Sequence, residues 1–419
     1  MRFLSDYIYL VKVLIRFCAP DLFTIKPDRK FFTHQSSIIT GCIIWLFELI
    51  SNIYTTVILE PILNCFSLYL GGRKNFGRTL VALVLTYLCL IISLLYMYLI
   101  PRRLSILYSC YMYLEYNSLK CSAYWEGFWL ILHFLCSHLL IINVYFHYLC
   151  AIFINPGTVP NILPSINHLN HSYNNNTVCT RCFIARPMRA HHCVVCKKCI
   201  LRMDHHCPWT ANCIGLYTHR HFYLVLIYMS IGGIYLLTVG WSDFKSYLTE
   251  EKQHQINATA QYSLSESNKF MHIPWKEFFN QLFKACFNFG FIAIPLVCAL
   301  CAWHTRLIST GETSIDRHIN AKFARVLKER GVLYRNPHDF GLFLNWVKFL
   351  GLIDKCDADF VKKKQKKESF QLYTFLCKRF FSRVLLPSFH PPYDDGFIYE
   401  LNLPTAESVI QSLAESGMS

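Results

Sequence analysis

The sequence predicts a mainly α-helical, multi-pass membrane protein. It has four transmembrane helices and a cytosolic cysteine-rich module that binds two zinc ions. Two observations carry this prediction: four long apolar runs, and a dense cluster of cysteines and histidines between the second and the third run. The composition agrees with it, because the 419 residues are 53% hydrophobic and only 16% charged, which is apolar for a soluble chain.

Each of the four apolar runs has about the ~20 residues that a membrane-spanning helix needs. Four such runs in one chain favour membrane helices over the alternative, four buried core helices of a large soluble protein. The runs are Asn75–Ile100, Phe128–Ile154, His221–Trp241 and Phe283–Trp303.

A further apolar region, Ile38–Leu70, is interrupted by Glu48, Glu60 and Pro61. Carboxylates that face lipid are costly, so we expect interfacial helices here, with a fifth span as the alternative. Residues 1–20 lack a clean apolar stretch and a small-residue cleavage site, so we expect no cleaved signal peptide.

Charge predicts the topology. The net charge of +15 would ordinarily suggest nucleic acid or an anionic surface as partner. Here the loop 153–220 carries seven Lys or Arg and one acid, whereas the loop 242–280 carries four Lys and five acids. The positive-inside rule then places the first loop and both termini in the cytosol and the second loop in the lumen. We therefore expect no nucleic-acid partner, and Asn257 becomes the available glycosylation acceptor.

The expected organisation has five parts. They are residues 1–76, a cytosolic N-terminal segment with interfacial apolar helices; 77–154, transmembrane helices one and two; 155–220, the cytosolic cysteine-rich module; 221–303, transmembrane helices three and four with the luminal loop 242–280; and 304–419, a cytosolic tail. Within the tail we expect a helix over about Thr313–Glu329 and an apolar-aromatic piece around Phe340–Leu352. The basic run Lys362–Lys367 is either solvated or attracted to anionic headgroups.

Seven of the twenty cysteines cluster between Cys179 and Cys213, together with several histidines. In a reducing compartment this pattern favours metal thiolates over disulfides. Zinc prefers four soft ligands in a tetrahedron, and the spacing supplies two such sets, either interleaved or sequential. A RING-type module would need another Cys-x2-Cys pair after Cys213 and outside the apolar runs, and none follows there. One thiol, Cys207, is left beside an imidazole and a carboxylate, which suggests a nucleophile on a metal-built scaffold.

These residues resemble the DHHC family of protein S-acyltransferases (palmitoyltransferases). The resemblance rests on Asp204-His205-His206-Cys207, the following Pro208-Trp209, the ligand spacing and the four flanking spans, and it covers about Leu80–Gly351. It implies two interleaved zinc sites. Their ligands are Cys179, Cys182, His192 and Cys199 for one, and Cys193, Cys196, His206 and Cys213 for the other.

Three further motifs support the resemblance. Asn155-Pro156-Gly157 is similar to the family's Asp-Pro-Gly, and Thr313-Ser314-Ile315-Asp316 to its Thr-Thr-x-Glu. Asn336-Pro337 and Asn345-Trp346 are similar to its conserved tail motif. Ala211 departs from the family, which often has Asn there. The segment 306–351 is most similar to a vertebrate branch associated with the endoplasmic reticulum, so we expect the endoplasmic reticulum or the Golgi.

The resemblance implies an acyl-enzyme mechanism. Cys207 takes a palmitoyl group from acyl-CoA and passes it to membrane-proximal cysteine thiols of substrate proteins. A thiolate is the nucleophile, so His205 accepts the proton and Asp204 orients the imidazole. The alternative is a catalytically silent zinc-bearing membrane scaffold, against which the intact Asp204-His205-x-Cys207 set argues.

The spans and the module should also hold the two ends of the acyl donor. A C16 chain gains roughly 0.8 kcal/mol per buried CH2, so we expect a cavity among the helices. Gly232 and Gly233 are candidates to widen it, although close helix packing is the alternative use of small residues there. Arg186, Arg189 and His191 are candidates for the CoA phosphates, unless they simply face water.

Overall fold

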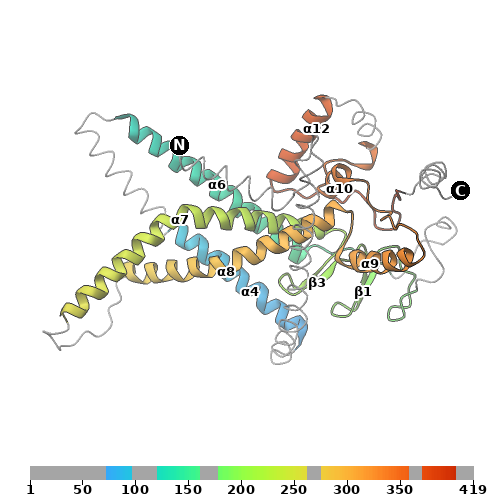
Figure 1. The fold of residues 1–419 in the computed structure, drawn as a ribbon, viewed down its shortest axis with the longest axis horizontal. Coiled ribbons are helices and arrows are strands. Elements are labelled where there is room, and N and C mark those ends of the chain that lie inside the picture. The colour runs from blue at the N-terminus through green and yellow to red at the C-terminus, as the bar shows by residue number, and fades with distance from the viewer. Residues whose placement is uncertain (1–71, 97–119, 161–177, 262–274, 358–369, 403–419) are drawn as a thin grey trace.

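The structure is a computed structural model, and it describes residues 72–96, 120–160, 178–261, 275–357 and 370–402. Helices dominate the described residues, and the strands are confined to the cysteine-rich module (Figure 1). The apolar region Ile38–Leu70 and the basic run Lys362–Lys367 both lie outside the described residues.

Four long helices are apolar enough to cross a membrane, which confirms the predicted fold class. Two neighbouring pairs, α6 with α7 and α7 with α8, make the main helix contacts, and α4 contacts α8 (Figure 1). Their spanning segments are 20 to 30 residues long, with mean hydropathy of 1.8 to 2.1. The helices are α4 (Arg73–Leu94), α6 (Lys120–Phe153), α7 (His219–Gln261) and α8 (Trp275–Ser309).

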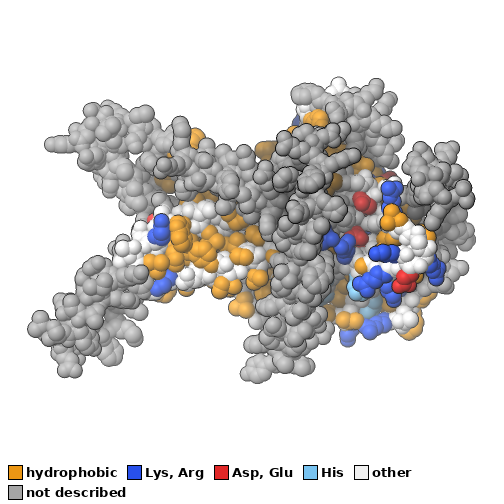
Figure 2. Space-filling model, in the orientation of Figure 1, with side chains coloured by type: hydrophobic (Ala, Val, Ile, Leu, Met, Phe, Trp, Pro, Cys, Tyr) orange, Lys and Arg blue, Asp and Glu red, His pale blue; other side chains and the backbone are white. Residues whose placement is uncertain are grey.

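The outer surface of these helices is apolar, as a lipid-facing surface must be. Figure 2 shows hydrophobic side chains over the helical part of the molecule and Lys and Arg side chains gathered at the end that carries the cysteine-rich module. Large apolar residues of the spans, such as Leu83, Ile131 and Ile292, are more than half exposed without a bilayer. In water such a surface would drive association, whereas lipid covers it.

The expected stretch 242–280 between the third and fourth spans contains helix at both of its ends. The α7 helix continues to Gln261 and α8 begins at Trp275. No Gly or Pro interrupts the sequence from Trp241 to Gln261, so nothing ends the helix where the apolar residues end. The change of polarity therefore marks where a helix leaves the membrane, not where it stops. Asn257 consequently lies near the C-terminal end of α7.

Gly233 does not widen a cavity. A Cβ atom added there would lie 2.6 Å from the Ile294 side chain of α8, so the glycine lets the two helices approach closely. The packing alternative is therefore the observed one at this position. Gly232 differs, because a Cβ atom added there would meet nothing within 4 Å.

The cysteine-rich module consists of two short antiparallel hairpins. In the first, β1 (His191–Cys193) pairs with β2 (Lys198–Ile200). In the second, β3 (His205–Cys207) pairs with β4 (Asn212–Ile214). Each hairpin turn has one residue with a left-handed backbone at the same place, Lys197 with φ 56° and Ala211 with φ 50°. The two hairpins are thus copies of one unit, fourteen residues apart in the sequence.

The tail folds back on both the spans and the module. Its helices are α9 (Ser314–Glu329), α10 (Leu342–Phe349) and α12 (Phe370–Phe380), with a 3-10 turn, η5 (Lys355–Asp357), and a π-helical turn, η6 (Phe381–Leu385). The expected helix over Thr313–Glu329 is confirmed as α9. Beyond η6, Phe397 packs on the apolar cluster that surrounds Cys199 of the module.

Candidate active site and metal centres

The end of α6 is fastened to the module by the Asn155-Pro156-Gly157 turn. The Asn155 side chain accepts hydrogen bonds from the backbone N–H groups of Gly157 and Thr158, both at 3.0 Å. Gly157 has φ 102°, which only glycine adopts without strain, and its carbonyl accepts from Leu201 N–H at 2.7 Å. Asn212 of β4 donates to the free carbonyls at the end of α6. The motif thus fixes the module on the membrane helices.

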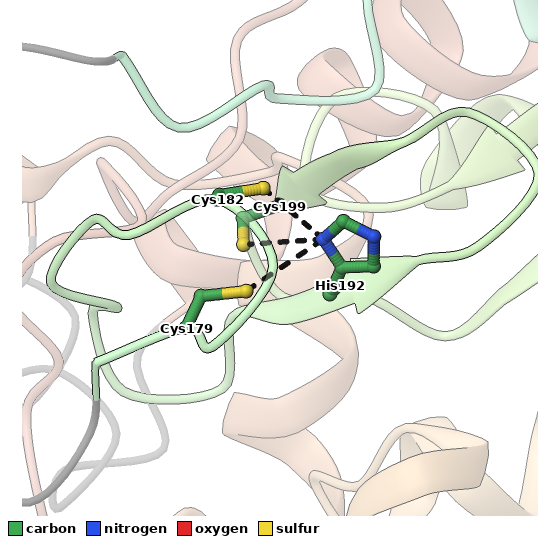
Figure 3. A group of neighbouring side chains, drawn as sticks. All are labelled: Cys179, Cys182, His192 and Cys199. Carbon is green, nitrogen blue, oxygen red and sulfur yellow. Dashed lines mark hydrogen bonds between the residues drawn. The ribbon is translucent and has the colours of Figure 1, made fainter.

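All eight predicted ligands lie in two separate groups, in the interleaved arrangement. Within each group the ligand atoms all lie within 4.8 Å of one another. Figure 3 shows the first group, in which three sulfur atoms surround one ring nitrogen. The groups are Cys179, Cys182, His192 and Cys199, and Cys193, Cys196, His206 and Cys213.

The spacing within the groups fits zinc. Zn–S bonds of about 2.3 Å and Zn–N bonds of about 2.0 Å at tetrahedral angles place sulfur and nitrogen roughly 3.5 Å apart. The three sulfurs lie 3.1, 3.6 and 4.0 Å from His192 Nδ1. In the second group the three sulfurs lie 3.4 to 3.7 Å from His206 Nδ1. Both groups could therefore hold a metal ion with four protein ligands.

The hairpin repeat explains why Cys207 is left over. The first hairpin supplies His192 and Cys199 to one group, and its inner knuckle, Cys193-x2-Cys196, to the next. Cys207 stands where Cys193 stands in the first hairpin, but Thr210 replaces the second cysteine of that knuckle. A third metal group therefore cannot form in this way, and Cys207 keeps the position of a ligand without a metal.

Strand geometry then places an imidazole and a carboxylate beside this thiol. Alternate residues of a strand point to opposite faces. His206 points to the metal ligands, so His205 and Cys207 share the other face. His205 Nδ1 bonds with Asp204 Oδ2 at 2.6 Å, and the same ring is close enough to Cys207 to lower the pKa of its thiol. The expected order of carboxylate, imidazole and thiol is thus present in the described structure.

The surroundings favour the charged forms of these three groups. Burial by itself raises the pKa of Asp204, but the hydrogen bond from His205 outweighs it and holds that pKa well below its usual range. Burial lowers the pKa of His205, yet Asp204 and Cys207 together raise it to about 10. Burial raises the pKa of Cys207, but His205 and the hydrogen bonds from Thr210 lower it overall. Both shifts favour a proton on His205 and a thiolate at Cys207.

The tail completes the site through a residue that the sequence did not single out. Ser314, the first residue of α9, donates to Asp204 Oδ1 from its N–H at 2.7 Å and to Oδ2 from its hydroxyl at 3.0 Å. Thr313 caps the N-terminus of α9, and the Thr313 N–H donates to the Asp316 carboxylate at 2.9 Å. The sequence could have indicated Ser314, because it lies inside the Thr313-Ser314-Ile315-Asp316 motif.

Two buried histidines were also missed. His304 of α8 brings a ring nitrogen within 4.8 Å of the ligand atoms of Asp204 and His205, and His219 of α7 stacks edge-on against it at 5.6 Å. Each is 1% exposed. His304 comes from α8, far from the module in the sequence, so no local spacing could have brought it to the site.

Arg189 is not placed to bind CoA. Its Nη2 forms an ion pair with Asp316 at 2.5 Å, its Nε donates to the same carboxylate at 3.0 Å, and its side chain is only 6% exposed. It therefore joins the module to α9. The pKa of His191 is lowered overall: burial lowers it most, Asp316 raises it in part, and Arg186 and Arg189 lower it further. Asn345 donates to the Ser309 carbonyl at 2.8 Å, which fastens α10 to the end of α8.

Cys207 lies at the boundary between the module and the spans. Cys207 is 3% exposed and belongs to an apolar cluster with Val144 of α6, Phe222 of α7 and Cys301 of α8. Fold and site therefore define a class: a multi-pass membrane protein in which two groups that could bind metal hold a buried thiol against the membrane helices.

Known proteins show the family. The family model for DHHC palmitoyltransferases matches residues 172–321. Palmitoyltransferase ZDHHC16A of Danio rerio is 30% identical over 376 residues, 84% of each chain. Palmitoyltransferase ZDHHC16 of Homo sapiens is 31% identical over 274 residues, 64% of this chain and 65% of the relative. A probable protein S-acyltransferase 15 of Arabidopsis thaliana is 28% identical over 209 residues, 48% of this chain and 72% of the relative. The chain belongs to the DHHC palmitoyltransferase family, and is thus a protein S-acyltransferase, as the sequence predicted.

Proposed function

We propose that this protein moves a long-chain acyl group, palmitoyl, from acyl-CoA through a Cys207 thioester to membrane-proximal cysteines of substrate proteins. The observation that carries the proposal is the position of Cys207. It lies outside both metal groups, on the same strand face as His205, and inside an apolar cluster of three membrane helices.

The first half-reaction follows from the ion pair. The Cys207 thiolate attacks the thioester carbonyl, the bond from the acyl carbon to the CoA sulfur breaks, and the proton on His205 passes to the departing CoA thiolate. Asp204 steadies the imidazole in both charge states through its bond to Nδ1. One thioester replaces another, so no external energy source is required.

The second half-reaction reverses the roles. A substrate thiol gives its proton to the neutral His205 and attacks the Cys207 thioester, which restores the thiolate and the imidazolium. Ser314 holds Asp204 at two oxygens and thereby keeps the imidazole oriented through both steps. This arrangement needs the start of α9, so the tail acts as a positioning element for the site.

The acyl donor would be held at two ends. Val144, Phe222 and Cys301 surround the nucleophile with apolar surface, and the open side of Gly232 lies further along α7. Arg186 remains a candidate to bind the CoA phosphates by its charge. The pKa of His191 is lowered, so His191 would serve only as a hydrogen-bonding partner. Zinc in the two Cys3His groups would act structurally, because four protein ligands leave no open coordination position.

The topology proposal follows the charge pattern. The module and both termini face the cytosol, where acyl-CoA and reduced thiols are found, and the end of α7 that carries Asn257 faces the lumen. An endoplasmic reticulum or Golgi membrane is the compartment that this orientation and the resemblance to the vertebrate branch favour.

The test is transfer by purified protein in detergent micelles or vesicles. We expect release of CoA from palmitoyl-CoA that matches acylation of a membrane-anchored peptide with one cysteine. Cys207→Ser should abolish both, while it keeps the metal content. Peptide acylation at the wild-type rate by Cys207→Ser would show that the acyl group does not pass through this residue. A silent scaffold would release no CoA in either form.

A further inference from the structure

The α12 helix has an unusual outer face. Its inner residues Leu372 and Leu376 are at most 9% exposed and belong to the same apolar cluster as the spans. Its outer side chains are also apolar: Tyr373 is 59% exposed and Phe381, at the start of η6, is 58% exposed. Positions 373, 377, 380 and 381 follow helical spacing, so these side chains form one stripe. An aromatic stripe of this kind in water would be costly.

The position of this face relative to the spans shows what covers it. Asn143 of α6 donates to the Leu385 carbonyl at 3.1 Å, and Tyr228 of α7 donates to the Val384 carbonyl at 2.5 Å. Asn143 precedes Phe153, the end of its span, by about ten residues, which is about 15 Å of helix. Tyr228 is about 14 Å of helix from His219, where its span begins.

These depths reach the lipid. The two spans have 26 and 28 residues. They are therefore about 39 and 42 Å long, against a hydrocarbon core of about 30 Å. Even if all the surplus of about 9 to 12 Å lay on the module side, Val384 and Leu385 would be level with the edge of the hydrocarbon core. Phe389, 72% exposed, contacts Phe146 of α6 with ring centroids 4.8 Å apart, so the stripe continues onto the surface of the span.

We propose that the outer face of α12 and η6, together with Phe389, inserts into the interfacial layer of the leaflet on the module side and binds lipid. Aromatic side chains and a flanking base, the exposed Lys378, suit the boundary between headgroups and acyl chains. The tail is therefore anchored in the membrane on the same side as Cys207, and the bilayer contributes to its placement.

The α9 helix provides the contrast. It also exposes an aromatic residue, Phe323, at 57%, and it is rich in basic residues. However, α9 lies at the module, beyond the ends of the spans (Figure 1). The exposed fraction of the aromatic side chains therefore does not distinguish α9 from α12, whereas the position of each helix along the membrane spans does.

The experiment uses photocrosslinking in vesicles of phosphatidylcholine and phosphatidylserine. p-Benzoylphenylalanine replaces Phe381 or Tyr373 in the full chain, and lipid adducts are counted by mass spectrometry after irradiation. Two positions of similar exposure serve as references: Ile131, 62% exposed within the α6 span, for full lipid contact, and Phe323 on α9, 57% exposed, for a position away from lipid. We expect adduct yields at 381 and 373 near that of Ile131 and at least about fivefold above that of Phe323.

Yields at 381 and 373 closer to that of Phe323 would overturn the proposal. The two stripe positions are independent substitutions, so one folded variant is enough to decide. The result does not depend on acyl transfer, because lipid contact is measured without acyl-CoA. A failure of the anchoring proposal and a failure of the proposed function are therefore separate outcomes.

Discussion

Replacing Arg189 decides between a structural and a CoA-binding role for this residue. The Arg189–Asp316 pair is buried, with side-chain exposures of 6% and 10%. Arg189→Met leaves the Asp316 carboxylate without its cation, and breaking a buried pair in this way costs about 3–5 kcal/mol. Asp316→Leu should cost as much, plus about 1 kcal/mol for the lost helix cap. The double variant replaces both charges by apolar groups and should recover about 2 kcal/mol of the summed loss.

The assay is unfolding of the purified variants in detergent by heat and by denaturant, followed by circular dichroism. The Michaelis constant for palmitoyl-CoA is measured in parallel on the folded protein, with Arg186→Gln as the matched control. We expect Arg189→Met to leave that constant within about twofold of wild type. Loss of a phosphate contact worth about 1.4 kcal/mol would instead raise the constant about tenfold. Unchanged stability with a tenfold rise in the Michaelis constant would refute the structural role.

Three further predictions address metal, packing and topology. Cys193→Ala should lose about one zinc per chain and much of its stability, because structural zinc contributes roughly 10 kcal/mol or more in small modules; two retained zincs by elemental analysis would reject the grouping. Gly233→Val should lower the thermal midpoint markedly and Gly232→Ala should not; equal midpoints would contradict close packing at Gly233. An endoglycosidase gel shift should depend on Asn257 and never on Asn175, which begins the sequon Asn175-Asn176-Thr177 in the predicted cytosolic loop 153–220; a glycan at Asn175 would place the module in the lumen.

The sequence predicted the elements whose signals are local. The four spans followed from run length, and both metal groups followed from ligand spacing once the family resemblance supplied the pairing. Strand alternation alone separates His205 and Cys207 from His206. The ends of the helices were less predictable. Polar residues after Trp241 look like a loop, but without Gly or Pro the helix continues to Gln261.

Contacts between distant segments were out of reach. Arg189 looked like a surface cation, because the sequence around it gives no indication of its partner Asp316, which is 127 residues away. His304 carries no motif of its own and acquires meaning only when α8 places it beside Asp204. From the sequence, Gly233 could either widen a cavity or allow two helices to pack closely. Only the position of Ile294 on the facing helix shows that it allows close packing.

Native mass spectrometry of one purified sample tests the central claim most directly, because it counts zinc ions and acyl groups on the same molecule. After exposure to palmitoyl-CoA, wild-type protein should carry two zinc ions and one hydroxylamine-sensitive acyl group. Cys207→Ser should carry two zinc ions and no such group. An acyl group on the Cys207→Ser protein, or loss of a zinc ion from it, would contradict the assignment of Cys207 as the thiol that both metal groups leave free.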